Sequence, residues 1–196
     1  MRFLLDGLPR PVQALLGWLT TIGISVAVVL ALRAEIASPY RIPSSSMEPT
    51  LHCARPAEGC LSGTSDRILA NRFVFHFRLP RRGEIVVFRT PPRTREACSE
   101  SGTFVKRVVG LPGETISEQE GVVYVNGRKL LEPYVLANER DVRSATWPRI
   151  PAGHFFMMGD NRRNSCDSRD WGTVPKDNLI GPVFLTYWPP KRLGTP

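Results

Sequence analysis

The chain has 196 residues, of which 42% are hydrophobic and 22% charged, a balance that argues against intrinsic disorder. Its formal net charge of +8 suits an anionic surface, but the arginines form no basic block or recognition-helix pattern, so we expect no nucleic-acid binding. The 18 prolines and 16 glycines, with short apolar runs after residue 60, indicate a turn-rich β domain.

The first element in chain order is an uncharged apolar stretch from Leu15 to Leu32. It is about 18 residues long, or about 27 Å as a helix, which matches the hydrocarbon core of a bilayer. It lacks the polar face of a helix at a protein surface. It is also longer than the apolar core of a cleavable signal peptide, the alternative, and no clear cleavage site follows. We therefore predict a retained transmembrane anchor over residues 15–33.

A single span places a short segment, residues 1–14, and the large remainder, residues 34–196, on opposite sides of the membrane. We expect the short segment in the cytoplasm, although the charges near the two ends of the span barely differ. These charges are Arg2, Asp6 and Arg10 on one side and Arg33, Glu35 and Arg41 on the other.

The remainder reads as a series of strands without a convincing helix or repeat. The strand candidates are 66–74, 84–88, 103–109, 121–130, 154–158 and 181–188. Asn126-Gly127, between two strand-like arms, is a strong hairpin signal, so we expect a small hairpin subdomain around residues 115–153. The predicted fold class is mainly β: one transmembrane helix followed by an antiparallel β-sheet domain.

The four cysteines are Cys53, Cys60, Cys98 and Cys166, none in CxxC spacing. With only three histidines, this pattern does not support a zinc site, and we expect no metal or cofactor. Cys53 and Cys60 bracket a short loop and would form a disulfide if the domain lies outside the cytoplasm; two free thiols are the alternative. The state of Cys98 and Cys166 stays open.

Three segments carry candidate chemistry: SSSMEPTL at 44–51, FVKRVVGLPGE at 104–114 and GDNRRNSCDSRDWG at 159–172. Singly, each has an ordinary explanation as a loop, a strand or a turn. Together, in this order behind an anchor, they resemble the bacterial type I signal peptidases. RRGEIVVFRTP at 81–91 matches as well, so that the resemblance runs from Ile42 to Trp171.

The residue types explain why such a site would work. A serine hydroxyl is a poor nucleophile at neutral pH and needs an adjacent base. None of the three motifs contains a histidine, but Lys106 has the apolar neighbours Phe104, Val105 and Val108. Burial among apolar groups lowers the pKa of a lysine, and a neutral lysine can act as the base in a Ser-Lys pair.

The resemblance assigns roles to individual residues. It implies that Ser46 is the acylated nucleophile and Lys106 the general base. Ser44 would donate a hydrogen bond to the oxyanion, together with the backbone N–H of Ser46, and Ser165 would orient the lysine. Four charged residues would support the site without taking part in the chemistry: Arg107, Asp160, Asp167 and Arg169.

The resemblance also implies the substrate and its place in the cell. Signal peptides of exported preproteins bind extended and present small residues at positions −1 and −3 relative to the cut. Shallow apolar pockets would be formed by Ile42, Pro43, Met47, Phe104 and Val105. The expected location is the inner (cytoplasmic) membrane, with the catalytic domain on the outer, periplasmic side, in contact with lipid and near the secretion translocon.

Two departures from the family pattern and three rival functions stay open. Arg163 stands where the third motif usually has an acidic residue, and Glu114 replaces an aspartate. The nearest rival is a specialised peptidase that matures one or a few exported proteins. A self-cleaving repressor also uses serine and lysine, but the apolar N-terminus disfavours it. The third rival is a membrane-anchored β module without activity.

Overall fold

The computed structural model describes residues 9–196, apart from the side chains of Arg10 and of residues 31–36. Arg2 and Asp6, which entered the prediction of orientation, lie outside the described residues, as does most of the predicted segment 1–14. The chain divides into two compact units, Met1–Ala37 and Ser38–Pro196.

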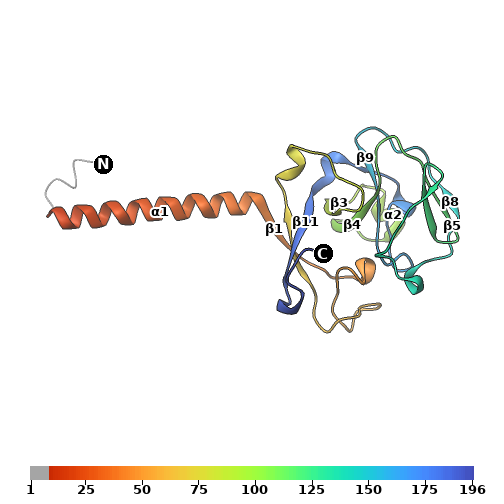
Figure 1. Ribbon diagram of the computed structural model, residues 1–196, viewed down its shortest axis with the longest axis horizontal. Coiled ribbons are helices and arrows are strands. Elements are labelled where there is room, and N and C mark those ends of the chain that lie inside the picture. Colours follow the sequence, from red (N-terminus) through yellow and green to blue (C-terminus); the bar gives the residue numbers. More distant parts are fainter. Residues whose placement is uncertain (1–8) are drawn as a thin grey trace. The chain divides into compact units, whose positions relative to one another are not determined.

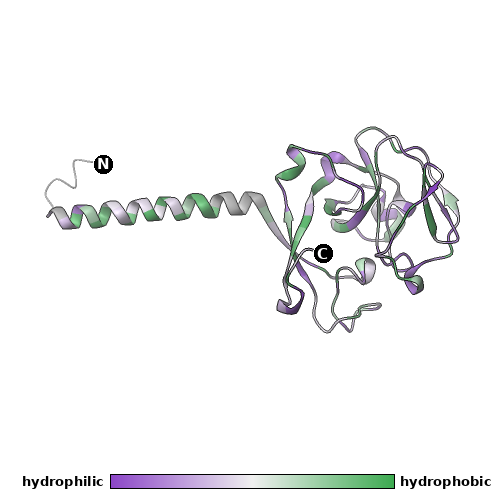
Figure 2. Cartoon of the chain, viewed as in Figure 1, coloured by the Kyte–Doolittle hydropathy of each residue, from purple (hydrophilic) through white to green (hydrophobic). Residues whose placement is uncertain are grey.

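The first unit contains one long helix, α1 (Arg10–Ile36). Within it, Pro11–Leu30 is long and apolar enough to cross a membrane, and none of its most apolar stretch is buried. Hydrophobic residues recur along the described part of α1 (Figure 2). The hydroxyls of Thr20 and Thr21 donate to the carbonyl of Gly17, so these polar groups are satisfied within the helix.

The second unit is built mainly of β-strands, as the sequence predicts. Its larger sheet has seven strands in the order β1-β2-β11-β3-β4-β9-β10. Figure 1 labels β1, β11, β3, β4 and β9 of this sheet. The bounds are β1 (Ala37–Arg41), β2 (Arg67–Asn71), β3 (Ile85–Arg89), β4 (Thr103–Gly110), β9 (His154–Met158), β10 (Val174–Pro175) and β11 (Leu179–Trp188). From β2 to β10, neighbouring strands pair antiparallel.

A second sheet has four strands in the order β7-β6-β5-β8. They are β5 (Ile116–Gln119), β6 (Val122–Val125), β7 (Arg128–Lys129) and β8 (Ala145–Thr146). The predicted Asn126-Gly127 turn is confirmed: it joins β6 to β7, with φ of 50° and 77° at its two residues. The hairpin is nonetheless only part of this sheet, so the subdomain is larger than the sequence suggested.

Two short helices, α2 (Thr94–Cys98) and α3 (Ser168–Trp171), correct the expectation that no helix follows residue 34. With five and four residues, they are too short to produce a helical hydrophobic period. Capping holds α3 instead: the Asp167 carboxylate accepts from the Arg169 N–H and Asp170 accepts from the Asp167 N–H. The 3₁₀ turns are η2 (Ser45–Met47), η3 (Val74–His76), η4 (Ala137–Glu139), η5 (Lys176–Asn178) and η6 (Pro190–Arg192).

Strand β3 lies at the centre of the hydrophobic core. Ile85 and Val87 pack in one cluster, while Val86 and Phe88, which point to the opposite face of the sheet, pack in another. Because both faces of β3 are covered, its residues form a continuous apolar run instead of alternating with polar ones. Strand β4 pairs with β3 in the sheet, and its Lys106 is therefore buried.

Candidate active site

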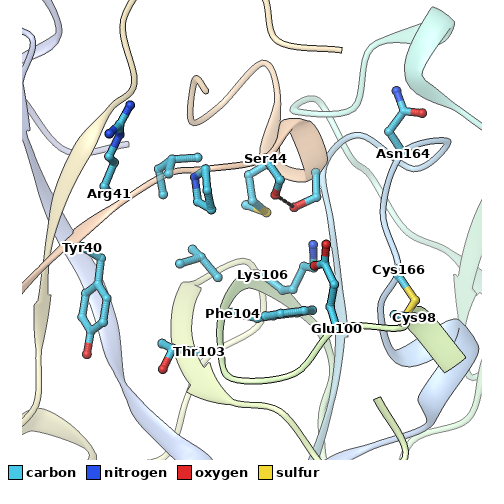
Figure 3. A pocket seen from close by; sticks show the side chains of 15 residues that line it. Tyr40, Arg41, Ser44, Cys98, Glu100, Thr103, Phe104, Lys106, Asn164 and Cys166 are labelled. Atoms are coloured by element: carbon cyan, nitrogen blue, oxygen red, sulfur yellow. Dashed lines mark hydrogen bonds between the residues drawn. A yellow bond between two sulfur atoms is a disulfide. The ribbon is translucent and has the colours of Figure 1, made fainter. Parts of the chain in front are cut away.

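Ser46 lies in the 3₁₀ turn η2, directly after the chain leaves β1. Two buried residues fix this segment in the core: Ile42 is 3% exposed and Met47 is 1% exposed. The Ser46 carbonyl accepts a hydrogen bond of 3.2 Å from the Asn161 N–H. Its hydroxyl lies 3.4 Å from that of Ser44, within hydrogen-bonding distance (Figure 3). The buried side chains of Ile42 and Met47 and the hydrogen bond from Asn161 therefore fix the turn in place. The hydroxyls of Ser44 and Ser46 lie at the wall of a pocket.

Lys106 occupies the middle of β4, opposite Val86 of β3, and is 2% exposed. Its Nζ lies 5.8 Å from the centre of the Phe104 ring. Burial lowers the pKa of Lys106 to about 8, against the opposing pull of Asp167. No hydrogen bond or ion pair to Nζ is formed within residues 9–196. A minor fraction of this lysine is thus neutral near physiological pH, and a general base needs this neutral form.

One pocket of about 450 Å³ brings the serine and the lysine together. Eight predicted residues line it: Ile42, Pro43, Ser44, Ser46, Met47, Phe104, Val105 and Lys106. Seven further lining residues were not predicted: Tyr40, Arg41, Cys98, Glu100, Thr103, Asn164 and Cys166. Figure 3 shows Tyr40 and Arg41 towards one end of the pocket and the Cys98–Cys166 disulfide with Asn164 towards the other.

Ser165 lies behind the nucleophile and does not line the pocket. Its hydroxyl donates to the Asp167 carboxylate over 2.7 Å. A side chain at Gly159 would collide with the Ser165 hydroxyl and the Ser46 carbonyl, so glycine allows these segments to approach. Within the described chain, no hydrogen bond joins Ser165 to Lys106. The orienting role of Ser165 therefore stays a prediction.

The predicted charged residues form two buried pairs that brace the site. Burial alone would raise the pKa of Asp167, but the Arg169 guanidinium holds it below its usual range with two hydrogen bonds of 2.8 and 2.9 Å. Arg107 holds Asp160 in the same bidentate way, over 2.8 and 2.5 Å. None of these four residues lines the pocket.

Two buried acids that pair with arginines of the third motif, Glu132 and Glu118, were not predicted. Glu132 pairs with Arg162 of the third motif, and both side chains are fully buried. Glu118 of β5 lies 3.6 Å from Arg169. Burial raises the pKa of Glu118 to about 7, although the Arg169 charge counteracts this. Arg163, the departure from the family pattern, is exposed and lies outside the pocket lining.

The cysteines form two disulfides. The predicted Cys53–Cys60 bond is confirmed, with a Cα–Cα distance of 5.1 Å. Cys98 and Cys166, which the sequence left undecided, are also bonded, with a Cα–Cα distance of 6.0 Å. This second bond ties α2 to the loop before α3 and forms part of the pocket wall.

A serine and a desolvated lysine in one pocket of a β domain define the class of serine hydrolases. Residues 15–188 match the family model described as "Signal peptidase, peptidase S26". The "Signal peptidase I" of Leptolyngbya laminosa is 38% identical over 95% of this chain and 86% of its own length. The "Probable signal peptidase I-2" of Synechocystis is 37% identical, over 87% of this chain and 72% of its own.

The chain therefore belongs to the signal peptidase family, peptidase S26, whose members are membrane-anchored serine endopeptidases that cleave signal peptides. It is also 32% identical to the "Thylakoidal processing peptidase 1, chloroplastic" of Arabidopsis thaliana, of which it spans about half (47%). A crystal structure of a signal peptidase I from Enterococcus faecalis is 32% identical, with a TM-score of 0.44. The match covers 54% of this chain and 97% of that one.

Proposed function

We propose that this protein cleaves the signal peptides of exported preproteins after small residues at −1 and −3, through an acyl-enzyme on Ser46 with Lys106 as the base. The observation that carries the proposal is that one pocket is lined by both Ser46 and Lys106, whose pKa is lowered to about 8 by burial. Neutral Lys106 takes the proton of the Ser46 hydroxyl as the oxygen attacks the scissile carbonyl.

The remaining steps use groups at the same pocket. Protonated Lys106 gives its proton to the leaving amine as the peptide bond breaks, and then takes a proton from the water that hydrolyses the ester. The oxyanion receives hydrogen bonds from the Ser44 hydroxyl, which lies 3.4 Å from the Ser46 hydroxyl, and from the Ser46 N–H. Ser165 keeps its proposed role of orienting Lys106 once a substrate excludes water.

The free edge of β4 supports an extended substrate. Strand β9 pairs only with the part of β4 from Arg107 to Gly110. Within residues 9–196, the outer edge of Thr103–Lys106 thus has no strand partner beside the pocket, and an added peptide strand would restore the ladder there. The apolar side chains around this edge leave room for small residues at −1 and −3: Ile42, Pro43, Met47, Phe104 and Val105.

The proposed location is the inner membrane, with α1 as a single span and the catalytic unit on the outer side. Two disulfides that involve all four cysteines support this side, because such bonds persist in oxidising compartments. The anchor would hold the pocket at the lipid surface near the translocon, where the cleavage region of a preprotein emerges.

The test is cleavage of a model preprotein in detergent by the wild type, Ser46→Ala and Lys106→Ala. Matched controls are Ser45→Ala, which removes the neighbouring hydroxyl, and Lys129→Ala, which removes an exposed lysine of β7. We expect the wild type and both controls to cut after a small residue and both site variants to be inactive. Cleavage that survives in either site variant would refute the dyad. Strict activity on one preprotein would favour a specialised peptidase.

A further inference from the structure

A second pocket of about 520 Å³ lies on the same unit. Prolines and tryptophans form most of its wall, among them Pro91, Pro148, Trp147 and Trp171. The proposed chemistry uses none of these residues. Aromatic-lined grooves commonly bind extended, polyproline-type peptide segments, and such segments lose little conformational entropy on binding.

The two short helices connect this second pocket to the catalytic pocket. Helix α2 begins just after Arg93, in the second pocket, and ends at Cys98, in the catalytic pocket. Helix α3 follows Cys166, in the catalytic pocket, and ends at Trp171, in the second pocket. At about 1.5 Å per residue, α2 spans only about 7 Å.

An aromatic pair provides a second link between the pockets. Trp171 packs edge-on against Phe104, with ring centres 5.7 Å apart. Phe104 lines the catalytic pocket and Trp171 the second one, so the pair forms part of the partition between them. The two pockets are therefore adjacent and separated by this aromatic pair.

The charge of the second pocket is positive. Arg93 and Arg149 line it, and no aspartate or glutamate does so within the described part of the chain. Neither arginine forms an ion pair there with any described residue, although Arg149 donates to the Gly113 carbonyl over 2.7 Å. Two guanidinium groups without acidic partners favour a ligand that carries a carboxylate.

The orientation of the substrate in the catalytic pocket indicates which part of it would reach the second pocket. The proposed function, on which this step rests, places residues before the cut near Ile42 and Pro43. These are the chain neighbours of Tyr40 and Arg41, which mark one end of the catalytic pocket (Figure 3). Residues after the cut then leave by the other end, past the Cys98–Cys166 disulfide. At about 3.3 Å per extended residue, they reach the second pocket within a few residues.

We propose that the second pocket binds the mature part of the preprotein, an extended segment with an acidic residue about four to eight positions after the cut. Preproteins with such a segment are the preferred substrates. The second pocket contributes to substrate binding and not to the chemical step. An acidic residue in the mature segment should therefore lower KM and leave kcat unchanged.

Three peptides test the proposal with the full-length protein in non-ionic detergent. One carries two glutamates in the window after the cut, one carries glutamines there, and one ends three residues after the cut. The variant Arg93→Gln/Arg149→Gln removes both pocket charges. The control Arg95→Gln/Arg128→Gln removes two exposed charges outside either pocket.

For the wild type and the control, we expect kcat/KM to be about 3- to 10-fold higher on the glutamate peptide than on the glutamine peptide, through KM. The pocket variant should cut both equally and should match the wild type on the short peptide. Equal cleavage of the two long peptides by the wild type would overturn the proposal. So would a control that loses the preference as fully as the pocket variant.

A binding experiment separates this proposal from the proposed function. Fluorescence anisotropy of the labelled mature-side segment alone is measured against the Ser46→Ala protein, with and without the two arginine changes. Tighter binding of the glutamate segment that depends on Arg93 and Arg149 supports the second pocket even if no peptide is cut. Equal binding of the glutamate and glutamine segments rejects it even if cleavage is efficient.

Discussion

Lys106 is the residue on which the proposed chemistry depends most. Desolvation in the middle of β4 lowers its pKa, and three carboxylates, those of Asp167, Asp160 and Glu100, oppose that effect. The balance, at about 8, keeps the amine basic enough to take a proton while leaving part of it neutral near pH 7. A histidine reaches this range without burial, whereas a lysine needs the surrounding core.

The pH dependence of kcat/KM follows from this balance. Only neutral Lys106 can accept the Ser46 proton, so the rate should fall as the pH drops below about 8. Lys106→Arg should be inactive at every pH, because the guanidinium stays protonated. A pH–rate profile on a peptide substrate checks both points. A profile that is flat between pH 6 and 9 would contradict a lysine base.

Glu100 tunes the same titration from the rim of the pocket. Its negative charge raises the pKa of Lys106, so Glu100→Gln should lower that pKa and move the acid limb of the profile to lower pH. Glu96→Gln, on the exposed side of α2, serves as the control and should leave the limb in place. Because exposed charges are screened, added salt should shrink the difference. An unchanged limb in Glu100→Gln would remove Glu100 from the site's electrostatics.

Ser44 is the proposed side-chain donor to the oxyanion. Ser44→Ala should lower kcat by about 10²- to 10³-fold with little change in KM, since the interaction is made in the transition state. Ser44→Thr keeps a hydroxyl and should retain more activity. Steady-state kinetics on one peptide would measure both variants, and an equal loss in the two would point to packing and not to hydrogen bonding.

Among the structural elements, the segment from Gly159 to Gly172 does most to shape the site. It holds the Ser46 carbonyl through the Asn161 N–H and contributes Asn164 and Cys166 to the pocket. The bidentate pair of Arg162 and Glu132 fixes this segment to the loop that follows β7. Both side chains are fully buried, so neither charge can turn to water if the pair is broken. Arg140, 3.5 Å from Glu132, is a second partner for the carboxylate, whereas Arg162 depends on Glu132.

Glu132→Gln should therefore destabilise the fold by about 3–5 kcal/mol, because it leaves the Arg162 charge buried without a counter-ion. The double variant Glu132→Leu/Arg162→Met removes both charges and should recover much of that loss. Thermal or denaturant unfolding of the three proteins measures the difference. If the double variant is less stable than Glu132→Gln, the cost lies in packing and not in the unpaired charge.

At the scale of the whole molecule, the chain separates into a helical unit and a β unit. The most apolar stretch of α1 is not buried. The β unit has its own core of three clusters and two disulfides. Its stability should thus be independent of the anchor.

Removal of residues 1–37 should leave the melting temperature of the β unit and its kcat/KM on a soluble peptide nearly unchanged. Cleavage of a preprotein inserted in lipid vesicles should slow, because the truncated enzyme no longer stays at the bilayer surface. The matched measurement compares the two substrates with both forms of the protein. A truncated protein that fails to fold would show that the units are not independent.

The sequence by itself determined the features that depend on neighbours along the chain. The uncharged run from Leu15 predicted α1, the segment 84–88 predicted a strand at β3, and Asn126-Gly127 predicted the turn between β6 and β7. The short spacing of Cys53 and Cys60 allowed their disulfide to be predicted as well. The motifs around Ser46 and Lys106 identified the family, since each motif is a local string of residues.

Only the tertiary structure decided which distant segments meet. The Cys98–Cys166 bond joins residues 68 positions apart, and Glu132 meets Arg162 across 30 positions. No local pattern encodes such pairs, because they depend on the order of strands in the sheets and on the loops between them. The same holds for Glu100 at the rim and for the second pocket between β9, α2 and α3, where long-range packing brings together residues that are unremarkable in sequence.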